Sequence, residues 1–254
     1  MDKIDIVATG DIILGDDCDY LFDQARPLLQ SADITVGQLE VTHTTRHSHA
    51  VSLGRTPQNL KPLADSGFDV LTLAGNHLMD YGQEGIEDTI AWLNEHQVHY
   101  LGAGMNLADA RKPVVIERKQ IRVGFLNYNC VGPRETWAGH EQPGNAYIHV
   151  ITHYELDHAN PGGTPKAYTF AEPKTMGWMR EDIQKLQSEC DYIVVALHKG
   201  LVHTPAELLD YEFQIAHEAI DAGADLVISH HSHILKGVEW YKGKPIYHGL
   251  CNGF

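Results

Sequence analysis

Basic residues, cysteines and long apolar runs are all scarce in this chain of 254 residues. Nineteen Lys and Arg stand against 34 Asp and Glu, and the resulting net charge of −15 argues against a protein that coats nucleic acid or an anionic membrane. No run approaches the roughly 18 apolar residues of a membrane-spanning helix. The first residues also lack the basic start and long apolar stretch of a signal peptide. We therefore expect a cytoplasmic or otherwise soluble protein without a membrane span.

The four cysteines are widely spaced and include no CxxC pair. They are too few for a disulfide scaffold in a chain of this length, and we expect buried thiols in a reducing compartment. Histidine is abundant instead, with 17 residues. This number is consistent with a metal site, although a His-rich acidic surface would give the same count.

Hydrophobic residues make up 43% of the chain and charged residues 21%, which excludes wholesale disorder, collagen and coiled coil. Short β-branched runs alternate with stretches of helical period, a pattern typical of an α/β fold. Helices are predicted over 83–96, 176–190 and 211–222, the last ending at Gly223. Strands are predicted over 5–9, 34–40, 70–73, 114–117, 121–127, 192–198, 226–229, 238–241 and 245–248.

Residues 131–173 are rich in Gly and Pro and show no clear period, so they predict a long loop-rich insertion between core strands. The chain ends at Phe254 directly after a predicted central strand, and we expect that its C-terminus is truncated.

Polar residues follow five of the predicted strands. Since ligands bind outside the carboxyl ends of strands in open α/β sheets, these endings predict one shared site. Their carboxylates, carboxamides and imidazoles suit Mn, Fe or Zn, as one or two ions. The endings are TGD (9–11), QLE (38–40), AGNH (74–77), LHKG (197–200) and SHHSH (229–233).

Each ending taken alone has an ordinary interpretation. Asp11 could cap a turn, the His cluster at 230–233 could be a surface run, and His43, His47 and His49 are best explained as a solvated loop. The metal site is favoured because five independent strand ends carry suitable ligands in order.

The order of these motifs resembles the calcineurin-like metallophosphoesterases, and specifically their CapA branch, the poly-gamma-glutamate or capsule biosynthesis proteins. The resemblance runs nearly end to end, and GNHLMDYG and HHSH are its most specific pieces. It implies a four-layer αββα sandwich that forms a single domain over residues 1–254, with metals at its rim. The other matching stretches are VATGDIILG, GQLEVTHT, IRVGFLNYN, HKG and SHHSHILKGVEWYKGKPIYHG.

The resemblance also implies roles for individual residues. Asp11 and Glu40 would be the carboxylate ligands, with Glu40 bridging two metals. His77 would protonate the leaving group, and Asp80 would orient it. The remaining metal ligands would be Asn76, His198, His231 and His233.

Three departures from the family pattern bear on the site. Classical members have Asp-x-His at the first strand, whereas this chain has Ile13 in the His position, so two metals would be held unequally or only one would bind. Gln38 replaces the usual Asn. Lys199 replaces the usual Trp and would favour a phosphate or polycarboxylate. With Arg134 and His230, Lys199 forms the predicted substrate-binding set, although Arg134 could equally anchor Glu135 or Glu141.

These observations predict a metal-dependent hydrolase in which a metal-activated hydroxide attacks a phosphoester of an anionic substrate. Two alternatives stay open: cleavage or transfer of gamma-glutamyl amides on poly-gamma-glutamate, and a non-catalytic module that binds the polymer or assists its export. The net charge of −15 works against a polyanion binder, because such a protein should have a basic surface. Nucleic acid is not an expected partner.

Overall fold

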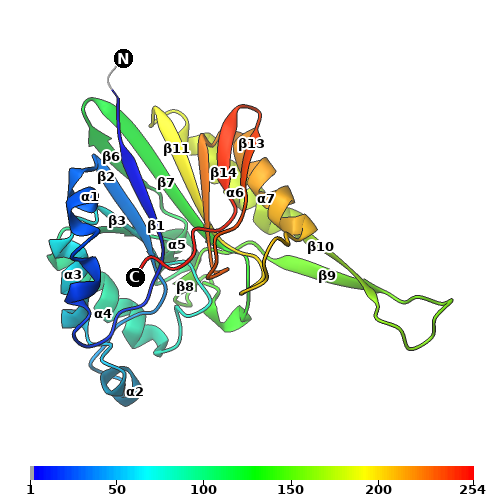
Figure 1. The fold of residues 1–254 in the computed structure, drawn as a ribbon, viewed down its shortest axis with the longest axis horizontal. Helices are drawn as coiled ribbons and strands as arrows, with labels where there is room; N and C mark the ends of the chain where they lie inside the picture. The colour runs from blue at the N-terminus through cyan, green and yellow to red at the C-terminus, as the bar shows by residue number, and fades with distance from the viewer. Residues whose placement is uncertain (1–2) are drawn as a thin grey trace.

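Two β-sheets face each other at the centre of the computed structural model, which describes residues 3–254 (Figure 1). The first sheet is parallel, with the spatial order β1 (Ile6–Ile12), β2 (Ile34–Leu39), β3 (Val70–Thr72) and β4 (His99–Leu101). In the second sheet, the outer strands β13 and β6 run antiparallel to their neighbours. Its order is β13 (Val238–Tyr241), β14 (Lys244–Tyr247), β12 (Leu226–His230), β11 (Tyr192–His198), β7 (Ile121–Asn129) and β6 (Val114–Arg118). All nine predicted strands are present, and β11 and β13 have the predicted bounds.

Helices cover the outer face of each sheet and complete four layers. On the first sheet, α1 (Arg26–Ser31), α3 (Lys61–Asp65) and α4 (Gly82–Glu95) bury an apolar cluster that includes Leu63, Ile86 and Leu93. On the second sheet, α6 (Pro173–Leu186) and α7 (Asp210–Ala222) do the same. A third cluster fills the space between the sheets. The predicted αββα sandwich and its three helices are confirmed.

The smaller elements lie in the connections between these layers. Within residues 3–254, no helix has the length and apolarity needed to cross a membrane. All four cysteines are free, but only Cys130 is buried, so the expectation of buried thiols is wrong for the other three. The short elements are 3-10 turns at Asp19–Phe22, Pro57–Leu60 and Arg134–Thr136, helices α2 (Ser48–Ser52) and α5 (Leu107–Ala110), and strands β5 (Ala103–Gly104) and β8 (Gly144–Asn145).

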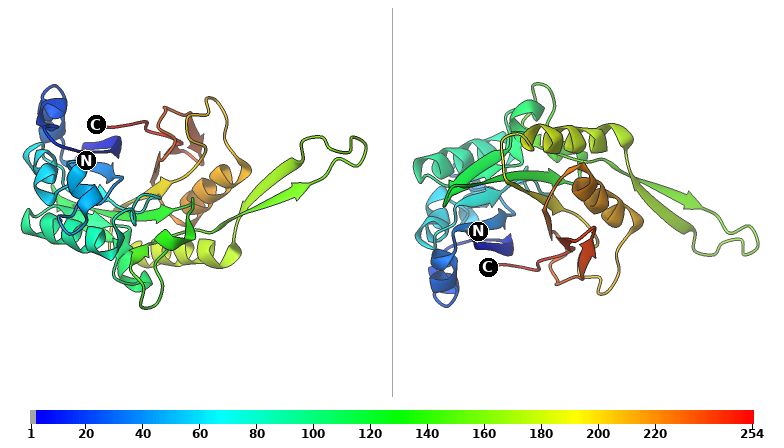
Figure 2. Two further views of the ribbon diagram at one scale, coloured as in Figure 1. Left: turned by 90° about the horizontal axis from the view of Figure 1, so that it is seen from below. Right: turned by 90° about the horizontal axis from the view of Figure 1, so that it is seen from above.

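The segment 131–173 is more regular than its sequence predicts. It contains an antiparallel hairpin of β9 (Val150–Glu155) and β10 (Lys166–Ala171), which projects from the body of the molecule as an arm (Figures 1 and 2). The prediction of irregular loop is therefore wrong for this part. Residues 152–155 are exposed on both faces of the ribbon, so they show none of the apolar alternation by which a half-buried strand is recognised.

Candidate metal centre

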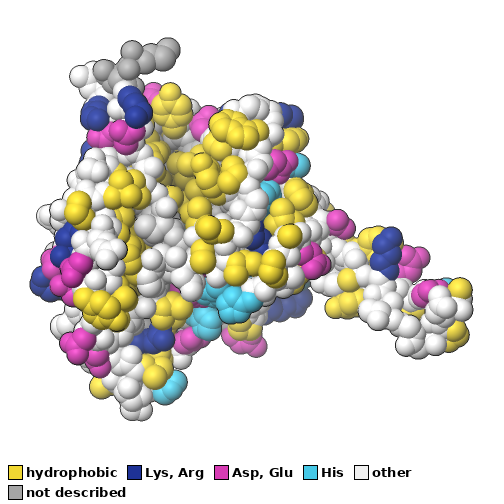
Figure 3. All heavy atoms as spheres, in the orientation of Figure 1, with side chains coloured by type: hydrophobic (Ala, Val, Ile, Leu, Met, Phe, Trp, Pro, Cys, Tyr) yellow, Lys and Arg dark blue, Asp and Glu magenta, His cyan; other side chains and the backbone are white. Residues whose placement is uncertain are grey.

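The predicted ligands converge at one edge of the sandwich, where the carboxyl ends of β1, β2, β3, β11 and β12 meet. Asp11 lies near the end of β1, Glu40 directly follows β2, and His198 is the last residue of β11. The others come from the turns after β3 and β12. In Figure 3, histidine side chains gather at this lower edge.

Three of the predicted ligands form a compact group, here called the first subset: Asp11, Glu40 and His233. One potential ligand atom from each lies within 4.8 Å of the other two. His233 Nε2 is 3.3 Å from Glu40 Oε1, and His233 Nδ1 is 3.9 Å from Asp11 Oδ2. This arrangement could hold one cation.

The other three predicted ligands, here called the second subset, are Asn76, His198 and His231. The amide oxygen of Asn76 is 2.7 Å from His198 Nε2 and 3.2 Å from His231 Nδ1. His198 Nδ1 lies 3.7 Å from Asp11 Oδ1, which brings the two subsets together. The sequence-based set of six ligands is thus assembled at one place.

Several buried polar atoms in this centre have no hydrogen-bond partner among residues 3–254: Asp11 Oδ1, both carboxylate oxygens of Glu40, and His198 Nδ1. Burial raises the pKa of Asp11 and Glu40. It also lowers the pKa of His198, and that of His231 to about 4. Buried carboxylates are costly without a counter-charge, and a divalent cation would satisfy these oxygen and nitrogen donors together. The donor set fits Mn, Fe or Zn.

The backbone around the centre is held by buried amides and by unusual turns. Asn127 accepts a hydrogen bond from the backbone N–H of Ala74, and Asn145 donates one to the carbonyl of Gly75, directly before Asn76. His231 and His233 both have left-handed backbone, with φ of 84° and 54°. Non-glycine residues adopt this conformation at an energetic cost, and such strain concentrates at functional sites.

His77 and Asp80 form a hydrogen-bonded pair beside the ligands. His77 Nδ1 lies 2.8 Å from Asp80 Oδ2, while Nε2 lies 4.0 Å from Glu40 Oε1. The hydrogen bond with Asp80 raises the pKa of His77. The partly exposed imidazole therefore holds a proton more readily than a free histidine, and its Nε2 lies on the side of Glu40, a predicted metal ligand.

Two of the predicted substrate contacts are wrong for this structure. The Lys199 side chain is fully buried and pairs with Glu212 at 3.1 Å, because it points from the end of β11 toward α7. His230 is fully buried as well, and its Nε2 bonds the carbonyl of Thr9 at 3.1 Å. Neither side chain is open to a substrate.

Arg134 is exposed, and its guanidinium contacts side chains of the same 131–173 segment. Its guanidinium stacks over Trp137 and its Nη2 lies 3.2 Å from His149 Nε2. The structure does not link it to the metal ligands, so its role as an anion contact stays a prediction.

Sequence reasoning missed two residues beside the centre. Asn252 lies with its amide oxygen 2.6 Å from His233 Nδ1, and the ring centroid of His203 lies 5.6 Å from that of His233. His203 had no motif around it. Asn252 follows the last strand without any local pattern, and only the fold brings it to the ligands.

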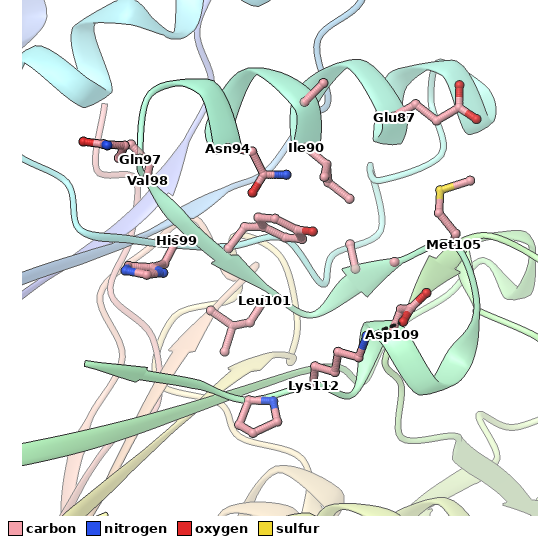
Figure 4. Close-up of a pocket in the computed structure, with 15 residues that line it drawn as sticks. Glu87, Ile90, Asn94, Gln97, Val98, His99, Leu101, Met105, Asp109 and Lys112 are labelled. Carbon is pink, nitrogen blue, oxygen red and sulfur yellow. Dashed lines mark hydrogen bonds and ion pairs between the residues drawn. The ribbon is translucent and has the colours of Figure 1, made fainter. Parts of the chain in front are cut away.

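A separate groove of about 980 Å³ lies between α4 and α5, beside the edge strand β4 (Figure 4). Ile90, Val98, Leu101 and Met105 give it apolar walls, with Asp109 and Lys112 near one end. None of the six candidate ligands lines this groove, so it is not part of the metal centre.

Relatives of known family match most of the chain. The chain is 27% identical over 267 residues to the capsule biosynthesis protein CapA of Bacillus anthracis, covering 99% of this chain and 59% of that protein. It is 27% identical over 258 residues to the PGA biosynthesis protein CapA of Bacillus subtilis (strain 168), covering 96% and 61%. The chain thus spans about three fifths of the length of these relatives.

The fold is similar to that of a solved calcineurin-like phosphoesterase, YfkN from Bacillus subtilis. The TM-score is 0.54 with 18% identity, covering 95% of this chain and 75% of that one. Residues 5–253 match the family model described as bacterial capsule synthesis protein PGA_cap. On the strength of that match, this chain belongs to the PGA_cap family of bacterial capsule synthesis proteins, built on a calcineurin-like phosphoesterase fold.

Proposed function

We propose that this chain is a metal-dependent phosphoester hydrolase that serves capsule or poly-gamma-glutamate synthesis. The observation that carries the proposal is the convergence of Asp11, Glu40 and His233. Asp11 Oδ1 and both Glu40 carboxylate oxygens are buried and lack partners among the described residues, whereas Asp11 Oδ2 accepts the His231 N–H at 2.8 Å. The link to capsule and polymer synthesis rests on the names of the family and of the two CapA relatives.

The chain's own residues would divide the work as follows. Asp11, Glu40 and His233 would hold one divalent cation, and Asn76, His198 and His231 would hold a second. When bound, such cations supply Lewis acidity and lower the pKa of water to a value near neutrality. Because these side chains are largely buried, the local dielectric is lower than in water, and the electrostatic attraction of the site for an anionic group is stronger.

His77 would act as the proton donor. Asp80 holds its Nδ1, so the protonated Nε2 is directed toward the edge at which Glu40 lies. A donor in this position protonates the departing oxygen of a phosphoester, a step worth on the order of 10²–10⁴ in rate.

Gamma-glutamyl amide cleavage or transfer is the second candidate, favoured by the name of the Bacillus subtilis relative, a PGA biosynthesis protein. The same donor set can polarise a carbonyl as well as a phosphoryl oxygen. Arg134, exposed on the segment between β7 and α6, would contact the carboxylates of such a polymer.

The test begins with metal content, measured by mass spectrometry on untagged protein purified without added metal and after Mn²⁺ reconstitution. We expect bound metal in the wild type and in a control His140→Ala at an exposed position, and its loss in Asp11→Ala/His231→Ala. The loaded wild type should hydrolyse an aryl phosphate. Protein that binds neither Mn²⁺ nor Zn²⁺ would refute the metal centre. Metal-loaded protein inactive on both phosphoesters and gamma-glutamyl amides would refute the enzyme.

A further inference from the structure

The segment that follows β14 runs beside β1 and contacts the first subset. Its backbone brackets Asp11: the Asp11 N–H donates to the Cys251 carbonyl at 3.0 Å, and the Gly253 N–H donates to the Asp11 carbonyl at 2.7 Å. The end of the chain is seen next to β1 in Figure 1. Asn252, between these two contacts, is thereby fixed at the metal edge.

Two features of the backbone show how closely this segment is fitted. A Cβ atom on Gly10 would lie 1.9 Å from the Cys251 carbonyl oxygen, so the segment can pass β1 only because residue 10 is glycine. Cys251 itself has a φ of 65°, in the left-handed region that non-glycine residues rarely adopt. Both features serve to bring Asn252 to its position.

The Asn252 side chain reaches one nitrogen of a ligand imidazole. Its amide oxygen, which can only accept a hydrogen bond, lies 2.6 Å from His233 Nδ1. With the amide oxygen as the acceptor, the neutral ring carries its proton on Nδ1 and its lone pair on Nε2. That Nε2 is the atom 3.3 Å from Glu40 Oε1, inside the first subset.

We propose that Asn252 is a positioning residue, which fixes the tautomer and the orientation of His233 so that Nε2 is free to bind a cation. The proposal rests on the metal centre of the proposed function and extends it to a residue outside the predicted ligand set. Partners of this kind orient metal-binding histidines and affect affinity strongly. The effect should be larger here than in a site with an Asp-x-His motif, because Ile13 leaves the first subset with three donors.

The test uses two measurements on the full chain: ¹⁵N chemical shifts of the imidazoles in metal-free protein at pH 8, and Mn²⁺ affinity from the free-ion signal in electron paramagnetic resonance. Asn252→Ala should shift His233 away from the Nδ1–H tautomer and weaken the Mn²⁺ site by about 10- to 100-fold. Asn252→Asp keeps an acceptor oxygen and should preserve both properties. Asn94→Ala, at an exposed position on α4, is the matched control.

An unchanged tautomer in Asn252→Ala, or unchanged Mn²⁺ affinity in a protein that binds the ion, would overturn the proposal. Loss of the tautomer in both Asn252 variants would overturn it as well, because the aspartate retains the acceptor. If the wild type binds no metal, the proposed function fails, and the tautomer comparison still decides whether Asn252 orients His233.

Discussion

Replacing Lys199 distinguishes the structural role found here from the substrate contact that the sequence suggests. The Lys199 Nζ lies 3.1 Å from Glu212 Oε2, and both side chains are fully buried. In Lys199→Met the apolar stem remains, and Glu212 keeps the Leu209 N–H at 3.0 Å as a donor but loses its counter-charge. Because the charge is then buried and uncompensated, we expect a loss of about 3–5 kcal/mol in the free energy of unfolding.

For a chain of this size, a loss of that magnitude lowers Tm by about 6–20 °C, at roughly 2–4 °C per kcal/mol. The matched control is Lys112→Met, which breaks a surface pair with Asp109 and should cost less than about 1 kcal/mol. Lys199→Met/Glu212→Gln removes both charges and should recover most of the stability.

The assay combines urea unfolding with steady-state kinetics on the metal-loaded protein, well below the Tm of each variant. Since Lys199 has no exposed surface, KM should stay within about twofold of the wild type in Lys199→Met. A variant of wild-type stability whose KM rises tenfold or more would refute the burial argument and restore Lys199 as a substrate contact.

Three further predictions follow from the described contacts. His77→Ala should lower kcat by about 10²–10⁴-fold on a substrate with a poor leaving group. The metal content measured by mass spectrometry should stay unchanged. Full activity of the variant would exclude His77 as the proton donor. Mn²⁺ at 100 times its Kd should add about 2.7 kcal/mol, hence about 5–11 °C in Tm by calorimetry, and EDTA should reverse the shift. His43 is fully buried, so the expectation of a solvated loop is wrong for this residue, and burial lowers its pKa to about 4. The contribution of neutral His43 to the free energy of unfolding should therefore be fully present above the unfolded pKa near 6.5 and should fall by about 2 kcal/mol from pH 7 to 5. Urea titrations of His43→Gln should lack this part of the pH dependence.

The strands and the ligand set were predictable because they depend on local patterns. The β-branched run of Tyr192–His198 has identical predicted and observed bounds, since a buried parallel strand is a short continuous apolar run. Its polar ending then places His198 at the carboxyl edge of the sheet. The same reasoning placed Asp11, Glu40 and Asn76 there, because every parallel strand delivers its ending to one edge.

The direction of side chains at that edge was harder to predict. Successive strand residues point to opposite faces, so if His198 faces the metal centre, Lys199 must face away from it. That signal was present in the sequence and would have excluded Lys199 as a substrate contact. For Asn252 no such signal existed, because its contact with His233 depends on how a segment outside the named strands and helices runs beside β1.

The two subsets differ in the donor atoms that they offer a cation, and we expect this difference to set the order in which metals bind. The first subset has two carboxylates, Asp11 and Glu40, and one imidazole. The second has two imidazoles and an amide. Borderline transition metals favour imidazole, so Zn²⁺ should fill the second subset first, whereas Mn²⁺, which suits carboxylates, should distinguish the two less. With Ile13 in place of a fourth donor, Asp11, Glu40 and His233 would hold the first cation with three protein groups, the number typical of catalytic zinc sites. The departure at residue 13 is therefore compatible with a catalytic centre whose two halves fill unequally.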